Sequence, residues 1–123
     1  MVSFEGSKVI KVNFSNERVE KNGSFDINST FSTSVNYDEN NKKCTCIYET
    51  RMKSSDELVD FEFEFKILGF FSYDGSDKKK IHLEILKTFY PYVQTSVMNL
   101  MSSFGYSNFM LPPLELSEED VNI

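Results

Sequence analysis

The sequence offers few of the residues that perform catalysis. It contains one histidine, two cysteines and no tryptophan among 123 residues. The single histidine, His82, falls at the start of a predicted helix, where a lone histidine is more typical of a surface or capping residue than of a catalytic base. No glycine-rich phosphate loop, serine nucleophile elbow or cluster of metal ligands occurs in the sequence. We therefore expect no catalytic residues, no metal site, no cofactor and no enzymatic activity.

The two cysteines, Cys44 and Cys46, lie two residues apart in a β-like run and point the same way from one strand. Neighbours at this spacing form at best a strained disulfide. Two thiolates without a second pair or a nearby histidine cannot complete a tetrahedral metal site. We expect both to pack as small apolar side chains.

Long apolar runs are also missing. No segment approaches the roughly 20 apolar residues that span a bilayer, and the segment 1–6 lacks the basic and apolar regions of a signal peptide. The formal net charge is −6, which repels phosphate backbones and attracts basic segments. We expect a cytoplasmic protein without stable membrane insertion and without a nucleic-acid partner.

Aromatic residues, by contrast, are abundant. The chain has 12 phenylalanines and 6 tyrosines, and such large side chains let a short chain build a core with some area left for a surface. A length of 123 residues has room for one domain, so residues 1–123 are predicted to form a single domain.

Period-two alternation, the signature of a half-buried strand, predicts four strands. It is clearest where Val59, Phe61, Phe63, Phe65 and Ile67 share one face and Asp60, Glu62, Glu64 and Lys66 share the other. The remaining predicted strands are Phe25–Tyr37, Lys43–Met52 and a weaker run, Val9–Phe14. The faces expected to be buried in the first two carry Phe25, Ile27, Phe31, Val35 and Tyr37, and Cys44, Cys46, Tyr48 and Met52. The short polar loops 38–42 and 53–57 predict antiparallel neighbours. The connection 16–24 is compatible with a hairpin or with a crossing to a non-adjacent position.

A helical period begins after residue 76. Apolar residues recur at steps of three and four from Asp77, a predicted cap, to the stop signal Gly105. Pro91 predicts a kink, or a break between a short helix and a longer one that starts at about Tyr90. The opposite face is polar but mostly uncharged, which suits packing against another subunit. Its residues are Lys87, Gln94, Thr95, Asn99, Ser102 and Ser103.

These elements predict an α+β fold in which a four-stranded antiparallel sheet is packed by a long C-terminal amphipathic helix. Glu62 and Glu64 stand on an open sheet face with no evident pocket, so a solvated face is a better interpretation than acid–base catalysis. The surplus of phenylalanines has two interpretations. All of these side chains fill the core, or some of them stay accessible and form a groove for extended polypeptide. In the second case edge strands would add backbone hydrogen bonds to the bound polypeptide.

Several motifs carry a resemblance to a known family. Residues 89–93 (FYPYV), 104–106 (FGY) and 111–114 (LPPL), together with Gly69-Phe70-Phe71, resemble the corresponding motifs of the SecB family of protein-export chaperones. The resemblance implies an ATP-independent chaperone that binds unfolded precursor polypeptides and passes them to the SecA motor of the translocation channel. It also implies a homotetramer built as a dimer of dimers.

The resemblance also implies functional residues. Client-binding positions would be Phe25, Ile27, Phe61, Phe63 and Phe65. Glu64 matches an acidic residue on the outer sheet face that contacts the motor, and we assign Glu62 to the same motor-binding surface.

Two departures from the family pattern bear on the motor. Lys11 stands where the family has an acidic residue on the first strand, and the chain stops at Ile123, where longer members add a helix and an acidic tail. A SecB-like chaperone dedicated to one partner, such as an antitoxin, is therefore the alternative to an export chaperone. A small-molecule or enzymatic cup on the sheet is disfavoured because the site chemistry is missing.

Overall fold

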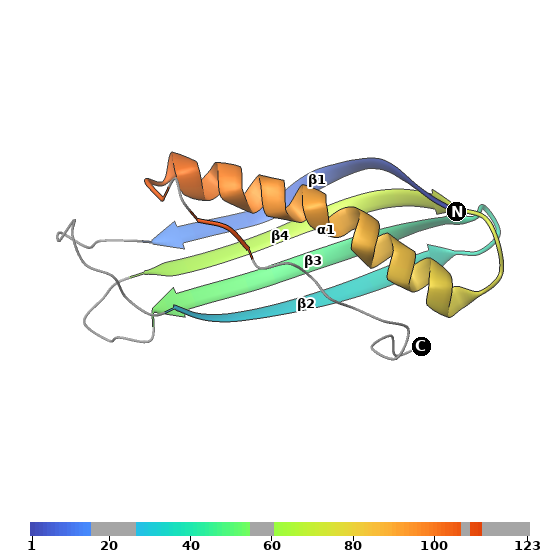
Figure 1. Ribbon diagram of the computed structural model, residues 1–123, viewed down its shortest axis with the longest axis horizontal. Coiled ribbons are helices and arrows are strands. Elements are labelled where there is room, and N and C mark those ends of the chain that lie inside the picture. The colour runs from blue at the N-terminus through green and yellow to red at the C-terminus, as the bar shows by residue number, and fades with distance from the viewer. Residues whose placement is uncertain (16–26, 55–60, 107–108, 112–123) are drawn as a thin grey trace. The chain divides into compact units, whose positions relative to one another are not determined.

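The computed structural model describes residues 1–15, 27–54, 61–106 and 109–111. It contains β1 (Val2–Ser15), β2 (Ile27–Asp38), β3 (Lys43–Ser54), β4 (Glu62–Tyr73) and α1 (Lys78–Ser103). The strands form one sheet in the order β1-β4-β3-β2 (Figure 1). The predicted fold class, a four-stranded antiparallel sheet with one long C-terminal helix, is confirmed. Since β1 and β2 are the two opposite edges, the connection between them joins non-adjacent strands, which decides between the two predicted alternatives.

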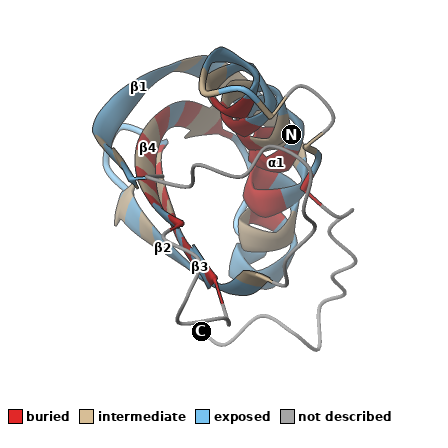
Figure 2. Cartoon of the chain, turned by 90° about the vertical axis from the view of Figure 1, so that its left-hand side faces the viewer, coloured by how far each residue is buried: buried red, intermediate tan, exposed pale blue. Residues whose placement is uncertain are grey.

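Alternation of apolar and polar residues explains β3 and β4. Their burial alternates residue by residue along both strands, and Figure 2 shows this alternation as red and tan bands along β4. The predicted inner faces are confirmed for Cys44, Cys46, Tyr48 and Met52 of β3 and for Phe61, Phe63, Phe65 and Ile67 of β4. Val59, predicted on the same face, lies outside the described residues.

The turn between β2 and β3 falls where the sequence predicts it. The Asp38 carboxylate accepts a hydrogen bond from the Asn41 side chain at 2.8 Å, and Lys42 adopts a positive φ of 52°. Short polar side chains that bond their own turn favour this geometry. The hairpin therefore joins β2 and β3 as antiparallel neighbours.

Strand β1 is longer than predicted, because it begins at Val2 and not at Val9. Its first half contains Ser3, Gly6 and Ser7, which have weak strand propensity, so alternation did not reveal it. Pairing supplies the missing stability, since the Asp74 N–H donates to the Met1 carbonyl at 3.1 Å.

The helix α1 starts as predicted. The Asp77 side chain accepts a hydrogen bond from the Lys80 N–H at 3.3 Å, and Gly105 has a φ of 102° just beyond the last turn. Of the two effects expected of Pro91, the break is wrong, because α1 is continuous through this residue, and the kink stays a prediction. Proline removes one backbone bond, but the buried stripe continues on both sides of it through Phe89 and Val93.

The described residues form two compact units. The first comprises those of Met1–Ser7, Val35–Cys46 and Gly69–Ile123, and the second those of Lys8–Ser34 and Ile47–Leu68.

An aromatic cluster joins α1 to the sheet in the first unit. The Phe89 ring lies 5.5 Å from the Phe71 ring, edge to face, and the Phe4 ring lies 5.3 Å from that of Phe71. Gly69 makes room for this cluster, since a Cβ there would lie 2.8 Å from the Phe89 ring.

The second unit has an aromatic core of its own. The Phe63 and Phe65 rings stack at 6.0 Å, and the Phe14 ring meets the Phe61 ring edge to face at 5.7 Å. Edge-to-face and offset arrangements of this kind are the favoured aromatic geometries.

Candidate functional site

Three of the predicted client-binding residues lie in the core. Phe61, Phe63 and Phe65 point to the inner face of β4, with exposed fractions of 2%, 0% and 0%. Ile27 is half-buried at the start of β2, and Phe25 lies outside the described residues. A polypeptide could touch the three phenylalanines only if the structure that covers them opened. Their role in client binding stays a prediction.

Strand β2 exposes an aromatic residue that was expected on a buried face. Phe31 is 60% exposed, although its ring stacks on that of Tyr48 at 5.9 Å and 17°. The physical reason is the position of β2 at the sheet edge, where no described strand covers its far side. A hollow of about 280 Å³ lies beside it, lined by Thr30, Phe31, Ser32, Glu49 and Arg51.

The outer sheet face of the second unit carries the predicted motor-binding carboxylates. Glu64 forms ion pairs with Lys11 at 2.6 Å and with Arg51 at 3.5 Å, and these cations hold the pKa of its carboxyl below the usual value. Glu62 is exposed two residues away and has no ion pair within the described ranges. The predicted departure at Lys11 thus has a structural counterpart, because this lysine neutralises Glu64. The motor-binding role of both glutamates stays a prediction.

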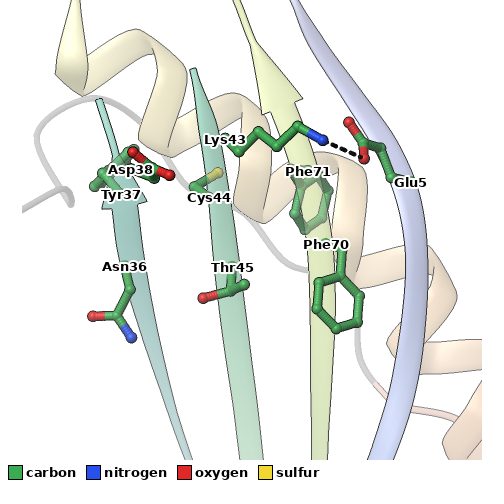
Figure 3. Close-up of a pocket in the computed structure, with 9 residues that line it drawn as sticks. All are labelled: Glu5, Asn36, Tyr37, Asp38, Lys43, Cys44, Thr45, Phe70 and Phe71. Carbon is green, nitrogen blue, oxygen red and sulfur yellow. Dashed lines mark ion pairs between the residues drawn. The ribbon is translucent and has the colours of Figure 1, made fainter. Parts of the chain in front are cut away.

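The first unit holds an open hollow of about 550 Å³ on the sheet (Figure 3). Phe70, 40% exposed, forms one side of it, and the Glu5 carboxylate faces Lys43 across it at 3.8 Å. The other lining residues are Asn36, Tyr37, Asp38, Cys44, Thr45 and Phe71. This lining mixes aromatic rings, an amide and charges of both signs, and its Glu5 carboxylate already pairs with Lys43. The hollow suits a peptide side chain better than a reacting substrate.

Sequence reasoning missed this hollow. Its members come from β1, β2, β3 and β4, and the sequence did not reveal the first half of β1 or the order of the strands. The one available signal was Phe70, an apolar residue at a position that alternation assigns to the outer face of β4.

His82 does not cap α1, since Asp77 does, and it is half-buried. Its Nδ1 lies 2.9 Å from the Tyr37 hydroxyl, which donates to it when Nε2 carries the proton. Burial lowers the pKa of His82 and raises that of Tyr37 to about 12. A neutral imidazole that accepts from a neutral phenol is a structural hydrogen bond.

Both cysteines are buried and free, as predicted. Burial raises the pKa of Cys44 to about 11 and that of Cys46 to about 12, so the nucleophilic thiolate is scarce. Across the described part of the chain, no group of three or more metal-ligating side chains occurs. No described helix is long and apolar enough to cross a membrane.

Comparisons with known proteins identify the fold. No family model and no curated protein matches the sequence. The structure is similar to the SecB-like chaperone Rv1957 of Mycobacterium tuberculosis, solved with a ChAD peptide from the antitoxin HigA1 (Rv1956). The TM-score is 0.72 over 92% of this chain and 90% of that chain, at 12% identity. A Streptococcus agalactiae protein of unknown function matches with a TM-score of 0.44 over 94% and 98%, also at 12% identity.

The first likeness shows the class of structure, which is the fold of a SecB-like chaperone. The expectation drawn from the motifs near Pro91 and Gly105 is confirmed at the level of fold.

Proposed function

We propose that this protein is an ATP-independent chaperone that holds an unfolded segment of one dedicated partner, such as an antitoxin. The observation that carries the proposal is the shared fold with a SecB-like chaperone that was solved with an antitoxin peptide. The described residues also lack a catalytic constellation, and the exposed aromatic side chains Phe31 and Phe70 suit many weak contacts with a polypeptide. In this proposal residues 1–123 act as one cytoplasmic chaperone domain.

Export through the Sec translocase is the second candidate, supported by the family-like motifs. It requires docking to the SecA motor, for which Glu62 and Glu64 were predicted. Glu64 is already paired with Lys11 and Arg51, so a basic surface of the motor would have to displace two intramolecular cations. This competition favours the dedicated chaperone over the export chaperone.

We further propose a homotetramer, a dimer of dimers in which α1 packs against another subunit. The helix exposes Tyr92 and Met98. Two of its hydroxyl groups already donate hydrogen bonds within the helix: Thr95 Oγ1 donates to the Pro91 carbonyl and Ser103 Oγ donates to the Asn99 carbonyl, both at 3.0 Å. A partner could cover this face without leaving these hydroxyls unsatisfied. The tetramer would have a mass of four times 14.3 kDa, about 57 kDa, which light scattering measures directly.

An aggregation assay tests the chaperone proposal. A denatured precursor protein is diluted into buffer with or without the chaperone, and aggregation is followed by light scattering. We expect suppression at an equimolar ratio that does not change on addition of ATP. Unaltered aggregation would refute a chaperone that accepts any unfolded chain.

A binding panel then separates the two candidates. Fluorescence anisotropy is measured with several unrelated unfolded proteins, purified SecA, and peptides tiled along an antitoxin encoded beside this gene, with a scrambled peptide as the control. A dedicated chaperone binds one antitoxin peptide at least about tenfold more tightly, a difference of about 1.4 kcal/mol. Comparable affinity for all unfolded chains, together with binding of SecA, would instead establish the export function.

A further inference from the structure

The two edges of the sheet are protected to different degrees. Natural proteins guard edge strands with charged residues, prolines or bulges, because unpaired backbone groups otherwise template the addition of another strand. Edge strand β1 carries Glu5, Lys8 and Lys11. Edge strand β2 carries no charge and no proline from residue 27 to residue 37. An unguarded edge of this length is a place for strand addition.

The accessible part of this edge is the segment Asn28–Ser34 in the second unit. All seven residues of this segment are exposed, and their side chains are serine, threonine, asparagine and one phenylalanine. None of them is charged, so an added strand does not have to desolvate an ion, which costs far more than desolvating a hydroxyl or an amide. Both the exposure and the composition of this segment therefore favour the addition of a strand.

One hydrogen bond establishes which backbone groups face outward. Thr50 Oγ1 of β3 donates to the Thr30 carbonyl at 3.1 Å, so the carbonyl of Thr30 points toward β3. Backbone groups of successive residues in a strand point to opposite sides. The N–H and C=O groups of Ser29, Phe31 and Thr33 therefore point to the open edge, where the structure describes no further strand.

We infer that the outward backbone groups of Ser29, Phe31 and Thr33 bind an extended segment of the client as an added β-strand. This inference rests on the proposed chaperone function and names its mode of recognition. Backbone hydrogen bonds give affinity with little dependence on sequence, and side-chain sites supply the preference. Phe31, stacked on Tyr48, is the apolar contact for the added strand. The hollow of about 280 Å³ between Thr30 and Arg51 receives an alternate side chain.

The occupant is an uncharged or basic client segment and not a second copy of the chain. The net charge of −6 on the chain attracts a basic segment, and a second copy with the same negative charge gains no such attraction. The segment is extended and rich in β-branched or aromatic residues, because it must continue the pleat of β2.

Hydrogen exchange of the unmodified protein tests the pairing directly. The probe is reduced, carboxamidomethylated bovine pancreatic trypsin inhibitor, a basic chain that cannot refold. With saturating probe, NMR should show exchange at the amides of Ser29, Phe31 and Thr33 slowed at least about tenfold, while those of Thr30 and Ser32 change little because they already face β3. The inference would be overturned if the amides of Ser29, Phe31 and Thr33 exchange as fast in the probe-bound protein as in the free protein.

A pair of variants tests the same edge through affinity. Thr33→Pro removes an outward N–H and blocks an added strand, and Thr33→Val keeps the donor and the strand propensity. We expect about tenfold weaker probe binding for the first variant, the loss of one or two backbone hydrogen bonds, and less than about twofold for the second. Circular dichroism checks that both fold. If Thr33→Pro does not fold, the exchange experiment still decides.

The remaining outcomes separate the two proposals. A lower solution mass for Thr33→Pro would show that β2 joins copies of the chain, which overturns the client as occupant. Failure of the unmodified protein to bind the probe, a denatured precursor and every antitoxin peptide would overturn the chaperone function and strand addition at β2 together. Probe binding without slower exchange at the outward amides would refute strand addition at β2 and leave the chaperone function standing.

Discussion

Replacing Gly69 with alanine places a methyl group where the Phe89 ring already lies. The new Cβ would sit 2.8 Å from two ring carbons of Phe89 and 2.9 Å from the Phe71 ring, whereas ordinary contact begins at 3.4 Å. The gap must open by 0.6 Å, the difference between 3.4 and 2.8 Å. Both rings are buried, so neither can turn into solvent, and close-packed interiors transmit such strain.

The expected destabilisation follows from two opposing effects. Overpacking a core typically costs about 1–3 kcal/mol, and replacing glycine with alanine returns about 0.4–1 kcal/mol by restricting the unfolded chain. The net loss for Gly69→Ala is about 1–2 kcal/mol in the free energy of unfolding. Urea denaturation followed by circular dichroism measures it, at a fixed protein concentration because self-association shifts apparent stability.

A double-mutant cycle identifies the cause. Phe89→Leu shortens the side chain that the methyl group meets and alone costs about 1–2 kcal/mol. If the clash explains the loss, the double variant Gly69→Ala/Phe89→Leu is more stable than the sum of the single effects by about 1 kcal/mol. Effects that add within about 0.5 kcal/mol would refute the packing argument, and a strand defect at Gly69 would remain as the explanation.

Three further perturbations test the core and its titratable groups. Phe63→Ser removes a fully buried ring and should lower the free energy of unfolding by about 3–5 kcal/mol or more. Thermal denaturation should therefore show a partly or wholly unfolded variant. A normally folded variant that has lost client binding would instead support the predicted groove. The folded-state pKa of His82 is lowered, so the unfolded state takes up the proton first as the pH falls below about 6.5. The free energy of unfolding should therefore decrease from about pH 6.5 down to the folded-state pKa. Urea titrations should show this decrease in the unmodified protein and not in His82→Gln. The thiols of Cys44 and Cys46 should react with iodoacetamide at pH 8 only after denaturant is added, because a pKa of about 11 or 12 leaves at most about one thiolate in a thousand; rapid labelling of native protein would contradict their burial.

The parts of the fold that could be predicted are those in which a single element decides its own structure. Strand β3 and the first half of β4 alternate between apolar and polar residues because one face is buried. The alternation ends at Ile67 only because Leu68 and Phe70 are apolar residues on the outer face, so the rest of β4 was not predicted. The apolar stripe and the Asp77 cap predicted the helix, but they could not decide whether Pro91 breaks it, because that depends on the packing of neighbouring residues.

The parts that could not be predicted depend on which strands are neighbours. The ion pair between Lys11 and Glu64 exists because β1 lies beside β4, and the crossing from β1 to the far edge leaves no local pattern. The hollow beside Phe70 needs four strands in one order, and the exposure of Phe31 follows from the edge position of β2. A sequence pattern assigns a side chain to a face, but only the order of strands determines whether that face or edge is covered.

The same reasoning changes what the abundance of aromatic residues means for function. The phenylalanines that motivated a client groove are largely used up by the two cores, since Phe61, Phe63, Phe65, Phe71 and Phe89 are buried. Composition therefore overstated the free aromatic surface. Backbone hydrogen bonding at an uncharged edge needs no such groove, because each added residue pair contributes its own contacts. A chaperone of this fold can therefore hold an extended segment without opening its core.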